Sequence, residues 1–434
     1  MTDVIEGFPA ITITYGKSGK AKNSDHAKDL QAFVMDQQLD ELVVMSHGWN
    51  NSASEAKDLY IGLLRHLRGS LDDEPDLKAR KIGVLAVVWP SKRFKAFEQE
   101  GDSGQMGGAA SAEPVIDDPL EDARTLSEVL DEDLSSAEHQ RLMDSVEAAI
   151  KDADKWSAFL DALQELVPNE PDAGDEADAL LLEGVKDPQM ALEQFDFIEV
   201  ESEDDFQAGG AAGSVGSGAA GAVGSVLNFT TFYLMKRRAG KVGQHGLAQS
   251  LVGLRNKRPN LRIHFIGHSF GARVVTMAAH ALNGQSSAAP DSMTLLQAAF
   301  SHNSFSASFP PPNKSGFFRN VMAKNCVKGP ILISHTFNDI PVRVAYSIAS
   351  ALSGDNASFA NSTPSQYGGL GANGARHMGA EAIAGKLLQT GASGYSFSSG
   401  KVFNLNSDQF IKGHSEIRVP QVGYAIVKAM ANTL

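Results

Sequence analysis

The sequence has a single cysteine, Cys326, so no disulfide can form within the chain. A chain without internal disulfides is typical of a reducing compartment. The first residues, MTDVIEGFPAITI, contain no basic segment followed by an apolar run and a small-residue cleavage site, as a secretory signal would. We therefore expect a cytoplasmic protein, although export by a route that needs no signal peptide stays open.

Several other sequence features are missing, and each absence excludes a class of protein. We find no internal repeat, no nucleotide-binding glycine loop with its acidic partner, and no His, Cys or carboxylate cluster with metal-ligand spacing. We therefore expect no cofactor, no catalytic metal and no nucleic-acid partner.

A run of 25 uncharged residues, Ala211 to Met235, precedes Lys236-Arg237-Arg238 and raises the question of a membrane span. Five glycines and three serines make this run weakly hydrophobic. We interpret it as a flexible linker that leads into a helix packed on the rest of the protein. A transmembrane span is not expected, whereas an interfacial contact with lipid stays open.

Charge is distributed very unevenly along the chain, whose formal net charge is -14. Glu98 to Asp205 contains 33 Asp and Glu residues against 5 Lys and Arg residues, so the remainder of the chain carries a balance of +14. The acidic block reads as an insertion, and helical spacing of apolar residues predicts at least one amphipathic helix over Gln140 to Val167. Such a block is a solvated face, a gate over a site, or a surface for a protein partner.

Outside this insertion, short apolar runs alternate with helical patterns, which predicts an α/β fold with a mostly parallel sheet and helices on both faces. Most of the runs are continuously apolar, as strands buried on both sides should be. The expected strands are 11–15, 41–47, 81–89, 261–267, 293–300, 330–337 and 401–406. The expected helices include 54–68, 228–254, 272–282 and 422–433.

A serine lies between two glycines at the point where one expected strand meets an expected helix, in Gly267-His268-Ser269-Phe270-Gly271. This segment matches the G-x-S-x-G pattern of a nucleophile elbow, a sharp turn that exposes a serine hydroxyl above the edge of a sheet. The helix that follows directs its N-terminus at negative charge that develops there. The motif indicates a nucleophilic serine at position 269.

An earlier strand ends in His47-Gly48-Trp49-Asn50, and with this second motif the chain resembles the α/β-hydrolase superfamily, whose lipases and esterases often carry His-Gly in this loop. The resemblance implies an oxyanion hole made of the backbone N–H groups of Trp49 and Phe270. It also implies a triad in the order serine, acid, histidine. Asp339 and His414 each follow an expected strand, so the resemblance assigns them as acid and base beside Ser269.

Other residues compete for these roles. Asp408 lies six residues before His414 and could serve as the acid, although the family's acid loop comes one strand earlier. We interpret His268 as a packing or hydrogen-bonding residue, His47 as a residue that fixes its loop, and Arg273 as structural.

The resemblance implies an α/β-hydrolase fold made of 1–97 and 228–434, interrupted by an acidic, partly helical insertion and a Gly/Ala/Ser-rich linker at 98–227. The function it implies is a serine hydrolase that cleaves a carboxylic ester, a lipid ester among them, through an acyl-enzyme. Two alternatives stay open: an amide or peptide hydrolase with the same triad, and a non-enzymatic hydrolase-like scaffold that presents the insertion to a partner.

Overall fold

The protein is built around one large sheet. The computed structural model describes residues 3–91, 119–130, 135–166, 219–285, 287–309, 314–343 and 368–433. In these residues the strand order is β1-β2-β4-β3-β5-β6-β7-β9-β8. β1 is antiparallel to β2 and the other pairings are parallel. The strands are β1 (Asp3–Ile5), β2 (Phe8–Thr14), β3 (Glu41–Ser46), β4 (Ile82–Val88), β5 (Arg262–His268), β6 (Ser292–Leu296), β7 (Ile331–His335), β8 (Ala382–Lys386) and β9 (Val402–Asn406).

Helices of very different lengths connect these strands. The α-helices are α1 (His26–Asp36), α2 (Ala53–Ser70), α3 (Pro75–Lys78), α4 (Pro119–Leu130), α5 (Ser136–Lys151), α6 (Trp156–Leu166), α10 (Ala219–Lys241), α11 (Ala248–Leu251), α12 (Leu254–Lys257), α13 (Phe270–Leu282), α14 (Arg319–Ala323), α16 (Leu370–Asn373) and α17 (Pro420–Ala431). A π-helical turn, Val242–Leu247, joins α10 to α11.

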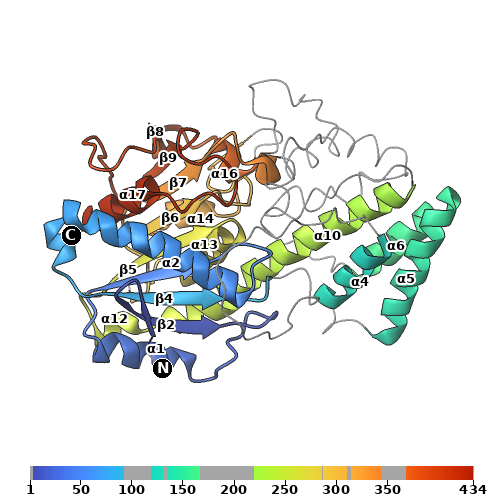
Figure 1. Ribbon diagram of the computed structural model, residues 1–434, viewed down its shortest axis with the longest axis horizontal. Helices are drawn as coiled ribbons and strands as arrows, with labels where there is room; N and C mark the ends of the chain where they lie inside the picture. Colours follow the sequence, from blue (N-terminus) through green and yellow to red (C-terminus); the bar gives the residue numbers. More distant parts are fainter. Residues whose placement is uncertain are drawn as a thin grey trace, which may run out of the picture.

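Helices cover both faces of the sheet, as the sequence predicts (Figure 1). Successive strand residues point to opposite faces, so in β3 Val44 joins the core under α1, α10 and α13, whereas Val43 joins the core under α2 and α17. All six residues of β3 are buried. The continuous apolar runs in the sequence therefore mark the central strands of this sheet.

Each of the seven strands expected from the sequence is present, with ends that differ by a few residues. β1 and β8 were not expected. β8 lies at the edge of the sheet, and its residues are exposed or half-buried, so it lacks the apolar run that marks a central strand.

The described part of the acidic insertion is helical. At least one helix was expected over Gln140 to Val167, and two are present, α5 and α6, because the chain leaves α5 at Asp152 and α6 begins at the buried Trp156. α4 and α5 pack against α10, and these helices extend to one side of the sheet (Figure 1). Most of the acidic block, and the proposed boundary at 97/98, lie outside the described residues.

The Gly/Ala/Ser-rich segment is not a linker over its whole length. α10 begins at Ala219, nine residues before the expected helix start, and Ala222, Val223 and Val226 are buried in the main core. Glycine disfavours a helix locally, but burial of the small apolar side chains against neighbouring helices outweighs that preference. No helix in the described ranges has the length and apolar content needed to cross a membrane.

Candidate functional site

Ser269 occupies a sharp turn between β5 and α13. Its backbone angles are φ 55° and ψ -122°, a region that side chains other than glycine rarely adopt. The turn is held by hydrogen bonds from the Ser269 N–H to the Leu296 carbonyl, at 3.0 Å, and from the Ala272 N–H to the Ser269 carbonyl, at 3.1 Å. Ser269 therefore stands at the carboxyl end of a central strand and at the N-terminus of a 13-residue helix.

Gly267 and Gly271 are required because neighbouring backbone atoms occupy the space that a side chain would need. A Cβ at Gly267 would lie 2.4 Å from the Gly271 carbonyl oxygen, and a Cβ at Gly271 would lie 2.1 Å from the carbonyl oxygen of Ser46 in β3. Both distances are far shorter than any van der Waals contact. The glycines thus let α13 approach β3 and β5 closely enough to form the turn.

Asp339 and His414 are brought together from loops after β7 and β9. The His414 Nδ1 lies 2.9 Å from the Asp339 Oδ1, and both side chains are buried, Asp339 completely. Because a carboxylate oxygen accepts, Nδ1 carries the hydrogen, and in the neutral ring Nε2 then keeps its lone pair.

The same histidine lies beside the serine turn. The Nε2–H of His268, the residue before Ser269, donates to the His414 carbonyl oxygen at 3.0 Å, and the two imidazole rings have centroids 5.0 Å apart. Burial lowers the pKa of His268 to about 3, so this ring is neutral at physiological pH. Its role is to hold the His414 loop next to Ser269, in agreement with our interpretation of His268 as a hydrogen-bonding residue.

The carboxylate of Asp339 has further partners that fix its orientation. Its Oδ2 accepts from the Nε2 of Gln297 at 3.1 Å, and its Oδ1 accepts from the Val342 N–H at 3.1 Å. Gln297 follows β6, has φ 45°, and also accepts from the Ser334 hydroxyl at 2.7 Å. Sequence reasoning missed Gln297, although its position directly after a strand was a usable signal.

Asp408, the alternative candidate for the acid, accepts hydrogen bonds from the loop that follows β7 and carries Asp339. It accepts from the Thr336 hydroxyl and from the Phe337 N–H, both at 2.8 Å. Burial raises the pKa of Asp408, but hydrogen bonds from Asn406, Phe337 and Thr336 outweigh that effect and lower the pKa below its ordinary value. Asp408 therefore braces the loop that carries Asp339, while the hydrogen bond to His414 is made by Asp339.

The loop after β3 is fixed by His47. Its Nε2 accepts from the Trp89 N–H at 3.2 Å, so its Nδ1–H is left to donate to the Gly48 carbonyl at 2.9 Å. Burial lowers the pKa of His47 to about 4, which keeps the ring neutral. A Cβ at Gly48 would lie 2.8 Å from the Cβ of Ser269, so this loop passes directly over the serine.

Phe270 directly follows Ser269 in the chain, and Trp49 directly follows Gly48, which lies against Ser269. Phe270 is the first residue of α13, where a backbone N–H has no acceptor within the helix. Among the hydrogen bonds formed by the described residues, none uses the N–H of Trp49 or Phe270. Neither N–H group is therefore committed to a hydrogen bond with another described residue.

The side chains of these two residues meet a third aromatic residue that sequence reasoning missed. Phe232 of α10 contacts both rings, with centroids 5.8 Å from Trp49 and 4.8 Å from Phe270, and the latter two rings are 6.0 Å apart. Arg273 of α13 is fully buried and donates from Nε to the Lys236 carbonyl of α10 at 3.1 Å, as expected for a structural arginine. α10 therefore contacts the serine turn directly and also holds α4 and α5.

In the ranges that the structure describes, no group of three or more His, Cys, Asp or Glu residues could hold a metal ion. The arrangement of Ser269, His414 and Asp339 can support nucleophilic attack by a hydroxyl, with proton transfer to a histidine. Comparison with protein-family models, with curated proteins and with solved structures finds no match to this chain in any of the three.

The steric argument for the turn predicts a large difference between two glycine-to-alanine substitutions. Gly271→Ala should lower the free energy of unfolding by at least about 2 kcal/mol, because the new Cβ overlaps backbone that cannot move aside. Gly69→Ala, in α2, places its Cβ in open space and should be neutral or stabilising by up to about 1 kcal/mol. Urea unfolding measures both; equal effects would show that the close approach at Gly271 is not a constraint.

Proposed function

We propose that this protein is a serine hydrolase of the α/β-hydrolase fold that cleaves a carboxylic ester through an acyl-enzyme. The observation that carries the proposal is the buried hydrogen bond between His414 Nδ1 and Asp339 Oδ1, beside a serine held at φ 55° in a strand-to-helix turn. A hydrogen-bonded acid and histidine next to a strained, glycine-flanked serine is the arrangement that nucleophilic acyl transfer requires.

The first step is attack by the Ser269 hydroxyl oxygen on the ester carbonyl carbon. The Nε2 of His414 accepts the hydroxyl proton, because Nδ1 already carries a hydrogen bonded to Asp339. Asp339 stabilises the imidazolium that forms and holds the ring in this tautomer. The buried hydrogen bonds from Gln297 and Val342 fix the carboxylate for that role.

Negative charge then develops on the former carbonyl oxygen. The N–H groups of Trp49 and Phe270 would donate to it, and each such donor lowers the barrier by about 3 kcal/mol. The N-terminus of α13 adds a favourable dipole at the same place. His414 next protonates the leaving alcohol, and a water molecule releases the acyl group from Ser269 by the same steps in reverse.

Sheet topology supports the assignment to the α/β-hydrolase fold. Ser269, Asp339 and His414 follow β5, β7 and β9, three parallel strands whose carboxyl ends meet at one edge of the sheet. The order serine, acid, histidine along the chain is the order of that fold. The aromatic rings of Trp49, Phe232 and Phe270 make the surroundings of the oxyanion donors apolar, which favours an uncharged ester such as a lipid.

Labelling with a fluorophosphonate probe tests the nucleophile. Intact protein should form one covalent adduct, on Ser269, and hydrolyse a short p-nitrophenyl ester faster than the matching p-nitroanilide. Ser269→Ala should abolish labelling and reduce ester turnover by roughly 10³-fold or more, because the attacking oxygen is removed.

The matched control is Ser46→Ala, which removes another buried serine hydroxyl at the end of a neighbouring strand, one for which no described residue is a hydrogen-bond partner. This variant should keep both labelling and turnover. An intact protein that neither reacts with the probe nor cleaves either substrate would favour the non-enzymatic scaffold, and a preference for the anilide would favour an amide hydrolase.

Substitution of Asp339 should affect mainly kcat, whereas substitution of Asp408 should affect mainly stability. Asp339→Asn should lower kcat by roughly 10³ to 10⁴-fold, because the histidine loses its anionic partner. Asp408→Asn should lower kcat by less than about tenfold and instead reduce the free energy of unfolding by about 1 to 2 kcal/mol, because it weakens the bracing of the acid loop. Steady-state kinetics and urea unfolding separate these effects, and the opposite ranking of the two kcat values would transfer the acid role to Asp408.

A further inference from the structure

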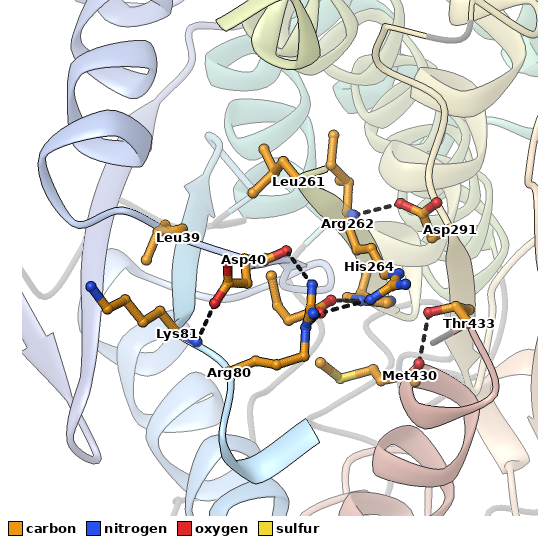
Figure 2. A network of polar contacts seen from close by, with 12 residues as sticks. Leu39, Asp40, Arg80, Lys81, Leu261, Arg262, His264, Asp291, Met430 and Thr433 are labelled. Atoms are coloured by element: carbon orange, nitrogen blue, oxygen red, sulfur yellow. Dashed lines mark hydrogen bonds and ion pairs between the residues drawn. The ribbon is translucent and has the colours of Figure 1, made fainter. Parts of the chain in front are cut away.

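A cavity lies at the edge of the sheet opposite to the one that carries Ser269. This cavity, of about 400 Å³, lies around the amino ends of β5 and β6. Its lining includes Arg80, Arg255, Arg262, Asp291 and Lys328. Figure 2 shows Arg80, Arg262, His264 and Asp291 near one another, at or just before the starts of β4, β5 and β6.

Positive charge exceeds negative charge around this cavity. The four cationic side chains of the lining face two carboxylates, Asp291 in the lining and the completely buried Glu41 behind it. Glu41 accepts from Arg80 and from His264 Nε2, the latter at 2.7 Å. The nearby Asp40 is already paired with Arg258 at 3.0 Å, and neither residue lines the cavity. The four cations of the lining thus share two carboxylates, which leaves a net surplus of two positive charges.

One of the four cations, Arg255, has a structural role. Arg255 donates to the carbonyl oxygens of Leu261 and Ala289 and to the Asp291 carboxylate, so its guanidinium holds three segments together. It contributes charge to the cavity, while the direct contacts to a ligand must come from the other three cations.

Those three cations retain donors that point to no described acceptor. Arg262 contacts Glu41 through one nitrogen, at 3.5 Å, and Arg80 uses its Nε for Glu41 and its Nη2 for a long contact to the Asp40 carbonyl, at 3.5 Å. A guanidinium has five N–H groups, so each arginine can still bind an oxyanion. The Lys328 Nζ lies 3.8 Å from the nearest Asp291 oxygen, and this side chain is 43% exposed.

Lys328 has another cation, Arg255, close enough to affect its protonation. Burial and the neighbouring Arg255 charge lower the pKa of Lys328, and Asp291 opposes them only in part. A bound anion would relieve this repulsion between cations.

We propose that this cavity binds a small phosphate compound with at least two linked phosphate groups, held by Arg80, Arg262 and Lys328. A volume of about 400 Å³ suits a small-molecule ligand. The surplus of two positive charges matches a multiply charged anion, and the planar forks of two arginines fit tetrahedral phosphate oxygens. Arg262 and Ser269 lie at opposite ends of β5, about 23 Å apart at 3.3 Å per residue, so this site is separate from the proposed hydrolytic site.

Titration calorimetry with inorganic pyrophosphate, in a low-salt buffer without phosphate, tests the proposal. The full-length protein should bind one pyrophosphate per chain, more tightly than orthophosphate or citrate. Lys328→Gln should raise the Kd by about tenfold, because it removes one of the cations that contact the ligand. The side chain makes only a loose ion pair, so this variant should fold as the parent does.

Two controls make the outcome decisive. Lys386→Gln removes an exposed lysine of β8, far along the sheet, and should change the Kd by less than about twofold. Fluorophosphonate labelling of Ser269 should be unchanged in Lys328→Gln, so a failure of either proposal can be recognised without the other. Absence of saturable binding, equal weakening by the two lysine variants, or binding of citrate as tightly as pyrophosphate would each overturn the proposal.

Discussion

The close approach of α13 to β3 and β5 is the constraint on which the arrangement of the candidate site depends. It is possible because Gly267 and Gly271 have no side chain where backbone atoms of α13 and β3 intrude. That approach allows Ser269 to adopt φ 55°, and it brings the β3 loop, through Gly48, against the serine. The proposed nucleophile, the proposed oxyanion donors and the helix N-terminus are therefore positioned by one packing contact rather than by three independent ones.

α10 connects this contact to the insertion. Phe232 packs against Trp49 and Phe270, the residues whose N–H groups we assign to the oxyanion hole, while α4 and α5 pack on the same helix. One helix thus contacts both the insertion helices and the proposed oxyanion donors. The cation-lined cavity lies at the other edge of the sheet, so the two ends of the parallel strands carry different chemistry: acyl transfer is proposed at the carboxyl ends and anion binding at the amino ends.

The sequence predicted most of the sheet because central strands are buried on both faces and read as unbroken apolar runs; β8, an exposed edge strand, has no such run. Asp339 and His414 could be named because each follows a strand, but Asp408 competed with Asp339 since sequence position does not show where a carboxylate points. Phe232 was missed because its partners lie far away along the chain. The start of α10 was missed because burial of its apolar side chains outweighs the unfavourable effect of glycine on helix formation.

The central claim, that Ser269 and His414 act as one catalytic unit, is tested most directly by comparing Ser269→Ala, His414→Ala and the double variant with a short p-nitrophenyl ester. If the serine attacks only with the help of the histidine, the double variant should lose no more kcat than the more damaging single variant, since either substitution already disables the unit. Losses that multiply in the double variant would show that the two residues contribute independently, and would contradict the account.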